Sequence, residues 1–289
     1  MQSGAIRPLN NMLPRNLFNT EHEAFRETVR KFYAKEVVPN IEKYEQQQHV
    51  DRELWNKAGT MGLLCATMPE AYGGSGVDRL YSMILIEEQA YAMDSSTGFS
   101  LHSDIVANYI NNFGNEAQKH YWLTRMASGE TVTAIAMTEP GTGSDLQAVR
   151  TTAVLDGDDY IINGSKIFIT NGYLCDMAVV VCKTGDTDKG SANLSLIIVE
   201  ADRVGFSKGK PLNKIGMKGQ DTCELFFDHV RVPKENLLGM EGMGFMMLMK
   251  ELAWERMLVA IICQAGAEAA LAHTVQYTKE RKAFGKTVS

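Results

Sequence analysis

A glutamate on an apolar helical stripe is the residue in this chain best suited to act as a base. Glu255 lies in a long helical pattern and faces the same side as several apolar residues. These residues are Leu248, Leu252, Val259 and Ile262. Desolvation raises the proton affinity of a carboxylate, which suits a general base. A boundary glutamate paired with Arg256 would fit the same pattern, and Glu251 on an adjacent stripe is a second candidate base, so the helical pattern does not choose among them.

A segment dense in turn-forming residues, Ala136 to Asp145, could bind a ligand. It reads Ala-Met-Thr-Glu-Pro-Gly-Thr-Gly-Ser-Asp. Gly141 and Gly143 permit a positive φ and the close approach of a flat ligand to the backbone. Thr138 and Ser144 offer hydroxyl groups. An ordinary interdomain turn would have the same composition.

A second segment, Ile162 to Gly172, reads Ile-Asn-Gly-Ser-Lys-Ile-Phe-Ile-Thr-Asn-Gly. Its two Asn-Gly pairs indicate turns around a short strand. Phe168 could pack on an aromatic ligand, with Thr170 beside it as a hydrogen-bond donor. A phenylalanine in the core of a sheet is the commoner use of such a residue.

The composition narrows the class of protein. The chain has 289 residues, of which 45% are hydrophobic, and a net charge of −6, which together favour one large or two to three small domains and argue against nucleic-acid binding. The five cysteines form no CxxC pair and the six histidines no HExxH motif, so we expect no metal site. GxGxxG and P-loop motifs are absent. The continuous apolar runs, such as 257–263, are too short to cross a bilayer, so we expect no transmembrane segment.

Three zones of different pattern follow one another along the chain. We expect residues 1–19 to be a leader, residues 20–129 a helical N-terminal domain, residues 130–240 a β domain and residues 241–289 the start of a helical bundle. The last zone carries a helical pattern over 245–282 without proline. Because one long helix cannot bury its own face, the sequence predicts further bundle helices from chain beyond the last residue or from a partner.

Local signals place several elements. Thr20 and Glu23 have capping-box spacing, and Asp51 is placed to cap a second helix. Residues 156–158, Asp-Gly-Asp, predict a hairpin turn. Short strands at regular spacing favour a barrel or sandwich. The predicted strands are 131–137, 151–155, 160–162, 166–170, 178–182, 194–200 and 223–232.

The two ligand-competent segments, together with Glu-Arg-Lys-Ala-Phe-Gly-Lys at 280–286, closely resemble the acyl-CoA dehydrogenase family. The resemblance covers essentially the whole chain from about residue 17, and the nearest subgroup is similar to the long-chain enzymes. It implies an α+β multidomain fold with an N-terminal helical domain, a middle β-barrel and a C-terminal helical bundle, of which only part is present in this chain.

The resemblance also implies an activity. Members of the family use FAD to convert acyl-CoA thioesters, here long-chain ones, to trans-2-enoyl-CoA in fatty acid β-oxidation. We therefore expect acyl-CoA as substrate, an electron-transfer flavoprotein as electron acceptor and a homotetramer. The location would be cytoplasmic in a bacterium and the mitochondrial matrix in a eukaryote.

Site residues follow from the resemblance position by position. Thr138 would bond the edge of the flavin ring and Phe168 would stack near it, while Arg281 and Phe284 would reach the FAD of a neighbouring subunit. The full set of expected FAD-binding residues is Ile135, Met137, Thr138, Gly143, Ser144, Phe168, Ile169, Thr170, Arg281 and Phe284. The expected substrate-binding residues are Ser144, Met246, Ala253, Trp254 and Arg256.

The resemblance also separates the two candidate bases. The long-chain and isovaleryl subgroups carry the catalytic glutamate on the long helix, at the position of Glu255 and not of Glu251. Two other functions fit the same residues: an acyl-CoA oxidase of the same fold, and a non-catalytic fragment with a decayed flavin site. Retention of Thr138, Thr170 and Glu255 argues against decay, whereas the family's continuation beyond this chain's last residue argues for impaired FAD binding.

Overall fold

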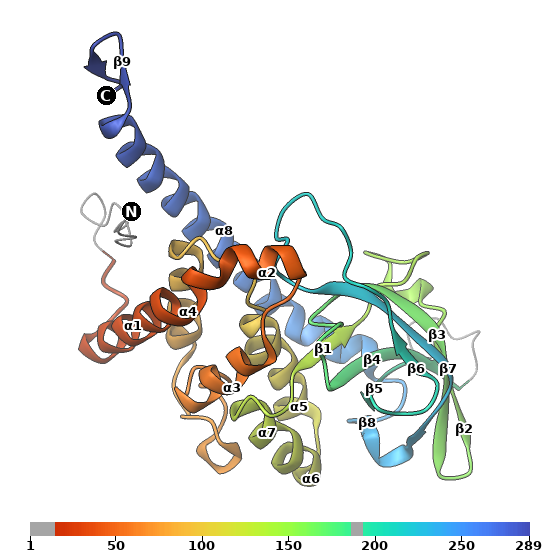
Figure 1. Ribbon diagram of the computed structural model, residues 1–289. Coiled ribbons are helices and arrows are strands. Elements are labelled where there is room, and N and C mark those ends of the chain that lie inside the picture. Colours follow the sequence, from red (N-terminus) through yellow and green to blue (C-terminus); the bar gives the residue numbers. More distant parts are fainter. Residues whose placement is uncertain (1–14, 186–192) are drawn as a thin grey trace.

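The structure is a computed structural model that describes residues 15–185 and 193–289 (Figure 1). Helices come first in the chain, an eight-stranded sheet follows, and one long helix leaves the body of the molecule as an arm. The predicted order of a helical domain, a β domain and part of a helical bundle is therefore confirmed. Residues 1–14 of the predicted leader lie outside the described residues.

Short helices build the N-terminal part. Its α-helices are α1 (Thr20–Phe32), α2 (Ile41–Gln47), α3 (Arg52–Thr60), α4 (Arg79–Tyr91), α5 (Ala107–Phe113), α6 (Glu116–Gln118) and α7 (Thr124–Ala127). The π-helical turns are η1 (Tyr33–Val37), η4 (Leu101–Val106) and η5 (Lys119–Leu123), and the 3-10 turns are η2 (Val38–Asn40) and η3 (Glu70–Tyr72). Trp55 and Phe99 are fully buried, and their ring centroids lie 4.9 Å apart in an edge-to-face contact that helps to fill this core.

The predicted N-terminal caps of α1 and α3 both differ from those in the structure. Asn19, and not the predicted pair Thr20 and Glu23, forms the capping box of α1: its side chain accepts a hydrogen bond from the His22 N–H at 3.0 Å, and the His22 ring accepts one from the Asn19 N–H at 3.2 Å. Asp51 does precede α3 as predicted, but its carboxylate makes no cap bond, because side chains of the preceding segment bind it instead.

The sheet follows the order β6-β7-β3-β2-β4-β5-β8, and β1 pairs in parallel with β4 (Figure 1). Among the described strands, β6 and β8 are the two ends of this path, so the pairing is that of an open sheet. The strands are β1 (Thr133–Ala136), β2 (Thr152–Asp156), β3 (Asp159–Thr170), β4 (Met177–Thr184), β5 (Leu194–Glu200), β6 (Phe206–Lys208), β7 (Thr222–Pro233) and β8 (Leu237–Leu238), with 3-10 turns η6 (Leu146–Ala148) and η8 (Lys234–Asn236).

Most of the predicted strands are present, and the hairpin at 156–158 joins β2 to β3. Two predictions were wrong in detail. Residues 160–162 and 166–170 belong to the single strand β3, because Asn163-Gly164 forms a register shift inside the strand and not a turn. The short strands β6 and β8 were not predicted.

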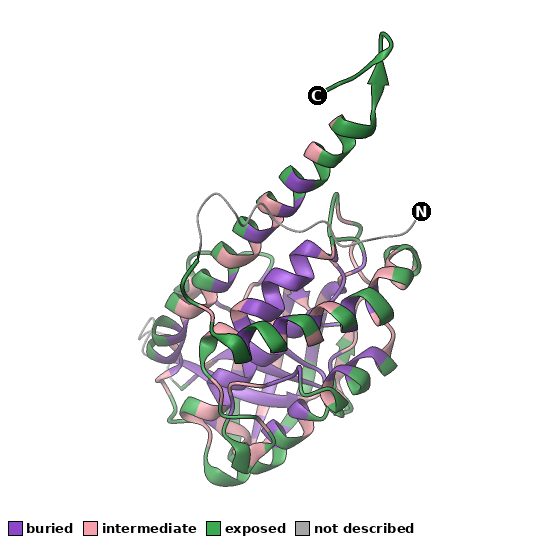
Figure 2. Cartoon of the chain, turned by 90° about the vertical axis from the view of Figure 1, so that its left-hand side faces the viewer, coloured by how far each residue is buried: buried purple, intermediate pink, exposed green. Residues whose placement is uncertain are grey.

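Helix α8 (Gly244–Glu280) confirms the predicted long helix, and a two-stranded ribbon of β9 (Lys282–Ala283) and β10 (Lys286–Thr287) ends it. Its outer part stands clear of the body and is largely exposed (Figure 2). The predicted stripe is partly wrong: Leu258 is buried, whereas Val259 is exposed. The buried residues of α8 are Gly244, Met247, Leu248, Glu251, Leu258, Ala265, Ala269 and Ala272.

By length and composition, α8 could cross a membrane. The short continuous apolar runs of the sequence did not indicate this. A helix from the core of a helical bundle passes the same test. The first half of α8 is packed on the body in this structure, with the carboxylate of Glu251 on its buried face. These contacts support a bundle helix.

The side chain of Asn171 links the N-terminal part to the sheet. Its amide donates hydrogen bonds to the Gly98 carbonyl at 3.1 Å and to the Thr133 carbonyl at 3.2 Å. Gly98 is required at this contact because a Cβ there would lie 1.9 Å from Asn171 Oδ1. The helical part and the strand that leads to the predicted ligand loop are therefore held in a fixed relation.

We predict that Gly98→Ala destabilises the protein, because the added methyl group displaces Asn171 and breaks both bonds. The expected loss is about 1–3 kcal/mol of unfolding free energy, measured by chemical denaturation. Gly216→Ala is the matched control, since a Cβ there meets no atom within 4 Å. Equal stability of the two variants would contradict the role of this contact.

Candidate active site

A buried ion pair holds the loop that follows β1 against β3. Lys166 Nζ lies 2.8 Å from Glu139 Oε1 and donates a second hydrogen bond to the Met137 carbonyl at 3.0 Å. The Glu139 carboxylate also accepts the backbone N–H groups of Arg150 at 2.6 Å and Thr151 at 2.9 Å. The Lys166 side chain is fully buried and that of Glu139 is nearly so.

The charge state of Glu139 follows from these contacts. Burial alone would raise its pKa, but the Lys166 ammonium and the hydrogen bonds around the carboxylate outweigh burial and hold the pKa of Glu139 below its usual value. Glu139 is therefore ionised at neutral pH. One strand end and one loop are joined by two charges that water does not reach.

The ion pair places the two predicted ligand segments side by side. The Ile167 N–H donates to the Thr138 carbonyl at 2.9 Å. Beside it, a register shift between Lys166 and Ile169 interrupts the pairing of β3 with β7. Phe168 lies in this bulge with a φ of 60° and a 62% exposed side chain. The alternative of a core phenylalanine is therefore not supported, whereas an exposed ring on a rigid strand suits packing against a ligand.

The loop also corrects the argument made for its glycines. Neither Gly141 nor Gly143 has a positive φ in the described backbone. A Cβ at either position would meet no atom within 4 Å, so the surface beside the loop is open. In the two segments the positive φ values occur instead on β3 and just after it, at Gly164, Phe168 and Asn171.

These residues fit the flavin that the sequence resemblance implies. The hydroxyl groups of Thr138, Ser144 and Thr170 make no hydrogen bond to another described residue, and all three residues are at least partly exposed. A planar ring system with polar edges needs an apolar face and a few hydrogen-bond partners, which the Phe168 ring and these hydroxyl groups supply.

The candidate base is held by a second set of contacts. Tyr109 of α5 donates a hydrogen bond from its hydroxyl to Glu255 Oε1 at 2.7 Å. One turn earlier on α8, Glu251 Oε1 accepts a hydrogen bond from Asn112 at 2.8 Å. Burial raises the pKa of Glu255, the bond from Tyr109 opposes this increase, and the charge of Glu251 adds to it. Arg256 is exposed and forms no ion pair with Glu255 in the described residues, so the boundary-pair interpretation is not supported.

One apolar cluster connects the base to the ligand loop. It contains Tyr109, Ile135, Met247 and Leu248, with Met137 packed against it. Ile169, the other buried residue of the predicted set, lies in the second core of the sheet. The loop and the first half of α8 therefore belong to one packed region, whereas the bulge borders the second core.

The predicted substrate residues on α8 are more exposed. Met246 and Ala253 face solvent, as does Ser144 of the loop, and the Arg79 guanidinium lies 4.4 Å from the centroid of the partly buried Trp254 ring. A channel wall would have to be completed on this side of α8.

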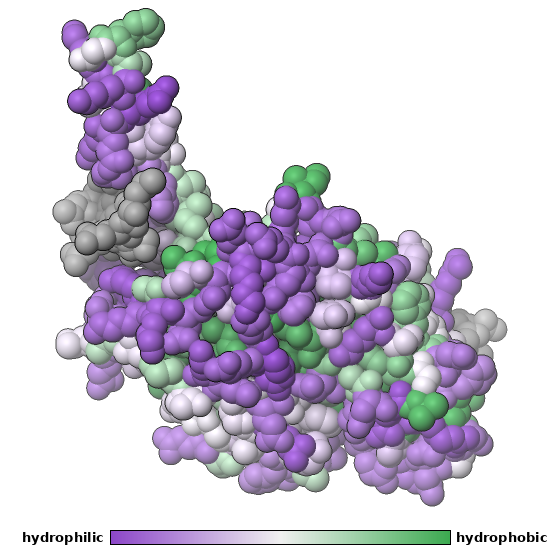
Figure 3. Space-filling view, viewed as in Figure 1, coloured by the Kyte–Doolittle hydropathy of each residue, from purple (hydrophilic) through white to green (hydrophobic). Residues whose placement is uncertain are grey.

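Two predicted FAD-binding residues lie far from the others. Arg281 and Phe284 are at the end of the arm, and the Phe284 side chain is fully exposed. Figure 3 shows apolar surface at this tip. The structure does not bring these residues to the loop at 137–145 of the same chain.

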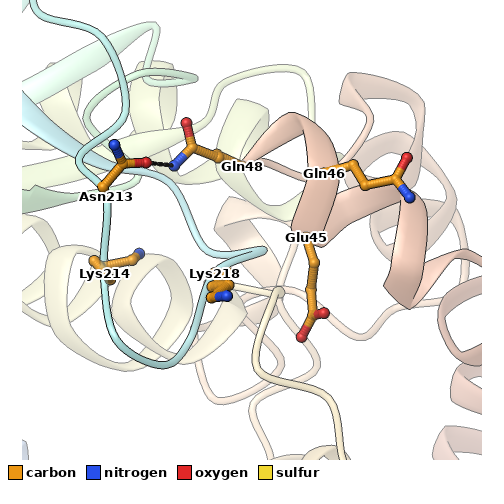
Figure 4. Close-up of a pocket in the computed structure, with 6 residues that line it drawn as sticks. All are labelled: Glu45, Gln46, Gln48, Asn213, Lys214 and Lys218. Atoms are coloured by element: carbon orange, nitrogen blue, oxygen red, sulfur yellow. Dashed lines mark hydrogen bonds between the residues drawn. The ribbon is translucent and has the colours of Figure 1, made fainter.

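A polar pocket of about 460 Å³ lies elsewhere, between the end of α2 and the segment before β7 (Figure 4). A hydrogen bond of 3.1 Å from Gln48 to Asn213 crosses its rim. Its lining residues are Glu45, Gln46, Gln48, Asn213, Lys214 and Lys218. None of the predicted site residues is among them.

The arrangement of an open loop, an exposed ring in a bulge and a glutamate on the long helix agrees with the results of comparison with known proteins. Family models match residues 19–130 (acyl-CoA dehydrogenase, N-terminal domain), 134–230 (middle domain) and 242–289 (C-terminal domain). The chain belongs to the acyl-CoA dehydrogenase family.

Individual relatives agree with this assignment. The chain is 49% identical over 290 residues to the mitochondrial long-chain specific acyl-CoA dehydrogenase of Sus scrofa, covering all of this chain and 67% of that protein. The crystal structure of an acyl-CoA dehydrogenase from Geobacillus kaustophilus matches with a TM-score of 0.92 and 47% identity, over 95% of this chain and 72% of that one. An acyl-CoA dehydrogenase from Bacillus anthracis, crystallised with FAD, matches with a TM-score of 0.88 and 33% identity, over 99% and 49% of the two chains.

The sequence analysis missed several residues that shape this acyl-CoA dehydrogenase site. Glu139 and Lys166 were inside the two quoted motifs but were not assigned a role. A lysine in a strand of otherwise apolar inward positions was the available signal, since such a lysine needs a buried anion. Tyr109 and Asn112 left no signal, because nothing local marks them as partners of residues on α8.

We predict that Lys166→Met leaves the Glu139 carboxylate buried without its cation. The expected loss of stability is about 3–5 kcal/mol, and FAD should be retained less well because the 137–145 loop is released. Both are measured on the purified protein, by denaturation and by the ratio of flavin to protein absorbance.

Two controls separate this effect from the loss of any lysine. Lys35→Met removes a partner of Glu36 from a side chain that is 83% exposed, and should change stability by less than about 1 kcal/mol. Adding Glu139→Gln to Lys166→Met should recover part of the loss, because the unpaired charge is removed. A double variant as unstable as Lys166→Met alone would argue against the ion pair as the cause.

Proposed function

We propose that this member of the acyl-CoA dehydrogenase family oxidises long-chain acyl-CoA thioesters to trans-2-enoyl-CoA, with Glu255 as the catalytic base. The observation that supports this most directly is the environment of Glu255. This residue is half-buried, one of its oxygens accepts a hydrogen bond, and burial raises its pKa. The similarity to long-chain specific relatives supports the substrate class.

The reaction requires a base and a fixed position of that base relative to the acyl group and the flavin. The C–H bond at C2 of the acyl group breaks and its proton passes to Glu255. The electron pair left on C2 forms the C2–C3 double bond as the hydrogen on C3 leaves with its own pair. FAD, when bound, supplies the acceptor for that hydride. Because the two C–H bonds break on neighbouring carbons, the base and the flavin-holding loop must stay in a fixed relation.

Glu255 is the better placed of the two carboxylates. Glu251 is only 5% exposed and its Oε1 is bound by Asn112, whereas Glu255 is half-buried and its Oε2 makes no hydrogen bond to another described residue. A base needs a free oxygen that a substrate can reach. We therefore assign proton abstraction to Glu255.

The FAD-holding residues are proposed in two groups. Thr138, Ser144, Phe168 and Thr170 of the loop and bulge would hold the ring within one chain, together with Ile135, Met137, Gly143 and Ile169. Arg281 and Phe284 at the arm's end would serve the site of a neighbouring subunit, which makes the active form an oligomer, and we propose a homotetramer.

The proposed partners follow from the family. The electrons would pass to an electron-transfer flavoprotein. The relatives described above include a mitochondrial and a bacterial protein, which agrees with a matrix location in a eukaryote or a cytoplasmic one in a bacterium. The substrate-binding residues are proposed as Ser144, Met246, Ala253, Trp254 and Arg256.

We predict that Glu255→Gln greatly slows proton abstraction and leaves substrate binding intact. Acyl-CoA should still perturb the flavin spectrum, while bleaching of the flavin by substrate slows by about 10²–10⁴-fold. Stopped-flow absorbance measures both. Glu251→Gln is the comparison variant and should cause a smaller loss. A Glu255→Gln protein that bleaches at the wild-type rate would show that the base is another residue.

We also predict that kcat/KM is greatest for long-chain acyl-CoA. The first reason is the similarity to the long-chain subgroup. The second is that each methylene group buried in an apolar channel contributes about 0.8 kcal/mol to the binding free energy. A series of saturated thioesters from four to sixteen carbons, about the range of common chains, measures the preference. A maximum at butyryl- or isovaleryl-CoA would reassign the substrate.

A further inference from the structure

Helix α5 contacts both carboxylates of α8 through two side chains on one face. Tyr109 and Asn112 are three residues apart on α5, and Glu251 and Glu255 are four apart on α8. Residues at these spacings lie on the same side of a helix. The result is a ladder of two hydrogen bonds, 2.7 Å from Tyr109 to Glu255 and 2.8 Å from Asn112 to Glu251.

The Tyr109 hydroxyl acts as a hydrogen-bond donor to Glu255. Its side chain is fully buried in the cluster that includes Met247 and Leu248, and burial raises the pKa of its hydroxyl well above the usual value. The hydroxyl therefore keeps its proton, and its bond fixes Glu255 Oε1 while Oε2 stays available. A buried aromatic ring with one polar contact restricts the carboxylate rotamer at little cost in entropy.

Glu251 has the opposite electrostatic effect. It is a carboxylate one helical turn from Glu255, and its negative charge favours a proton on Glu255. Asn112 holds that carboxylate in place, since Glu251 is 5% exposed. Three nearby cations do not pair with either carboxylate in the described residues: Arg79 of α4 lies over the Trp254 ring, Lys250 lies 5.2 Å from the Phe113 ring centroid, and Arg256 is exposed.

We propose that Tyr109 is the positioning residue of the base and that Glu251, fixed by Asn112, is the charge that sets how firmly the base holds the proton it removes. This inference rests on the proposed function. It assigns two opposing effects on Glu255: the Tyr109 hydrogen bond stabilises the charged carboxylate, and the charge of Glu251 destabilises it. In the transfer itself, the proton from C2 goes to Glu255 Oε2, and Tyr109 keeps its own proton.

The effects of Tyr109 and Glu251 can be distinguished because they shift the pH profile of kcat/KM in opposite directions. Removing the hydroxyl in Tyr109→Phe should move the acid limb of kcat/KM to higher pH by about one unit, since a hydrogen bond to a charged group is lost. Removing the charge in Glu251→Gln should move the same limb to lower pH by about half a unit to one unit. Tyr109→Phe should also lower kcat about tenfold with little change in KM, because the carboxylate loses its orientation.

A readout without turnover checks the same point. An acyl-CoA analogue with sulphur in place of C3 has acidified hydrogens on C2 and no hydride to give. The pH at which the bound analogue loses its proton, followed by absorbance, should shift in the same two directions in the two variants. Unfolding curves for each variant identify a loss of fold, and Asn112→Ala, which releases Glu251, should move the limb in the direction of Glu251→Gln.

Tyr72→Phe is the matched control. Tyr72 also donates a 2.7 Å hydrogen bond to a glutamate, Glu116, but at an exposed site away from α8, and its loss should leave the profile in place. Shifts of equal sign in Tyr109→Phe and Glu251→Gln, or no shift in either, would overturn the proposal. A wild-type rate in Glu255→Gln would overturn the proposed base instead, so the two failures are distinguishable.

Discussion

The site depends on one buried ion pair, that of Glu139 with Lys166. Either charge alone would be strongly disfavoured in the interior, so the folded state is stable only when the two are paired or both are removed. Their meeting joins the loop after β1 to β3 and places Thr138 beside Ile167. A loop with two glycines and a proline would otherwise have many conformations. The ion pair is therefore a conformational constraint as well as a contact.

The constraint explains why a strained backbone can persist at the bulge. Phe168 has a positive φ, which is unfavourable for a bulky side chain. Lys166 is fixed on one side of it by Glu139, and Ile169 on the other side resumes pairing with Cys223 of β7. With both neighbours fixed, the ring of Phe168 projects to solvent. The base is positioned by α5 through Tyr109, and the apolar cluster that contains Tyr109 also contains Ile135 and packs against Met137 of the loop.

The sequence predicted the elements better than the contacts. The long helix and most strands have enough residues for their periodicity to be recognised, whereas β6 and β8 have three and two residues and carry almost no pattern. The first segment of the site was recognised for Gly141 and Gly143, and neither of them has a positive φ. The bond from Tyr109 to Glu255 joins residues 146 positions apart, and periodicity within a segment has no information about such a pair. The Glu139–Lys166 pair, 27 positions apart, was within reach of the argument that a buried cation requires an anion.

The geometry of α8 restricts how the remaining proposed FAD residues can act. From Glu255 to Arg281 there are 26 residues, which at about 1.5 Å per residue is about 39 Å along a continuous helix. An arginine side chain is only a fraction of that length, so Arg281 and Phe284 cannot contact a flavin beside the base of their own chain while α8 remains helical. Beyond Ala272, α8 is largely exposed, whereas Ala265 and Ala269 before it pack against Ala90 and Tyr91 of α4. A role for these two residues in FAD binding therefore requires a second chain, and it ties cofactor binding to assembly.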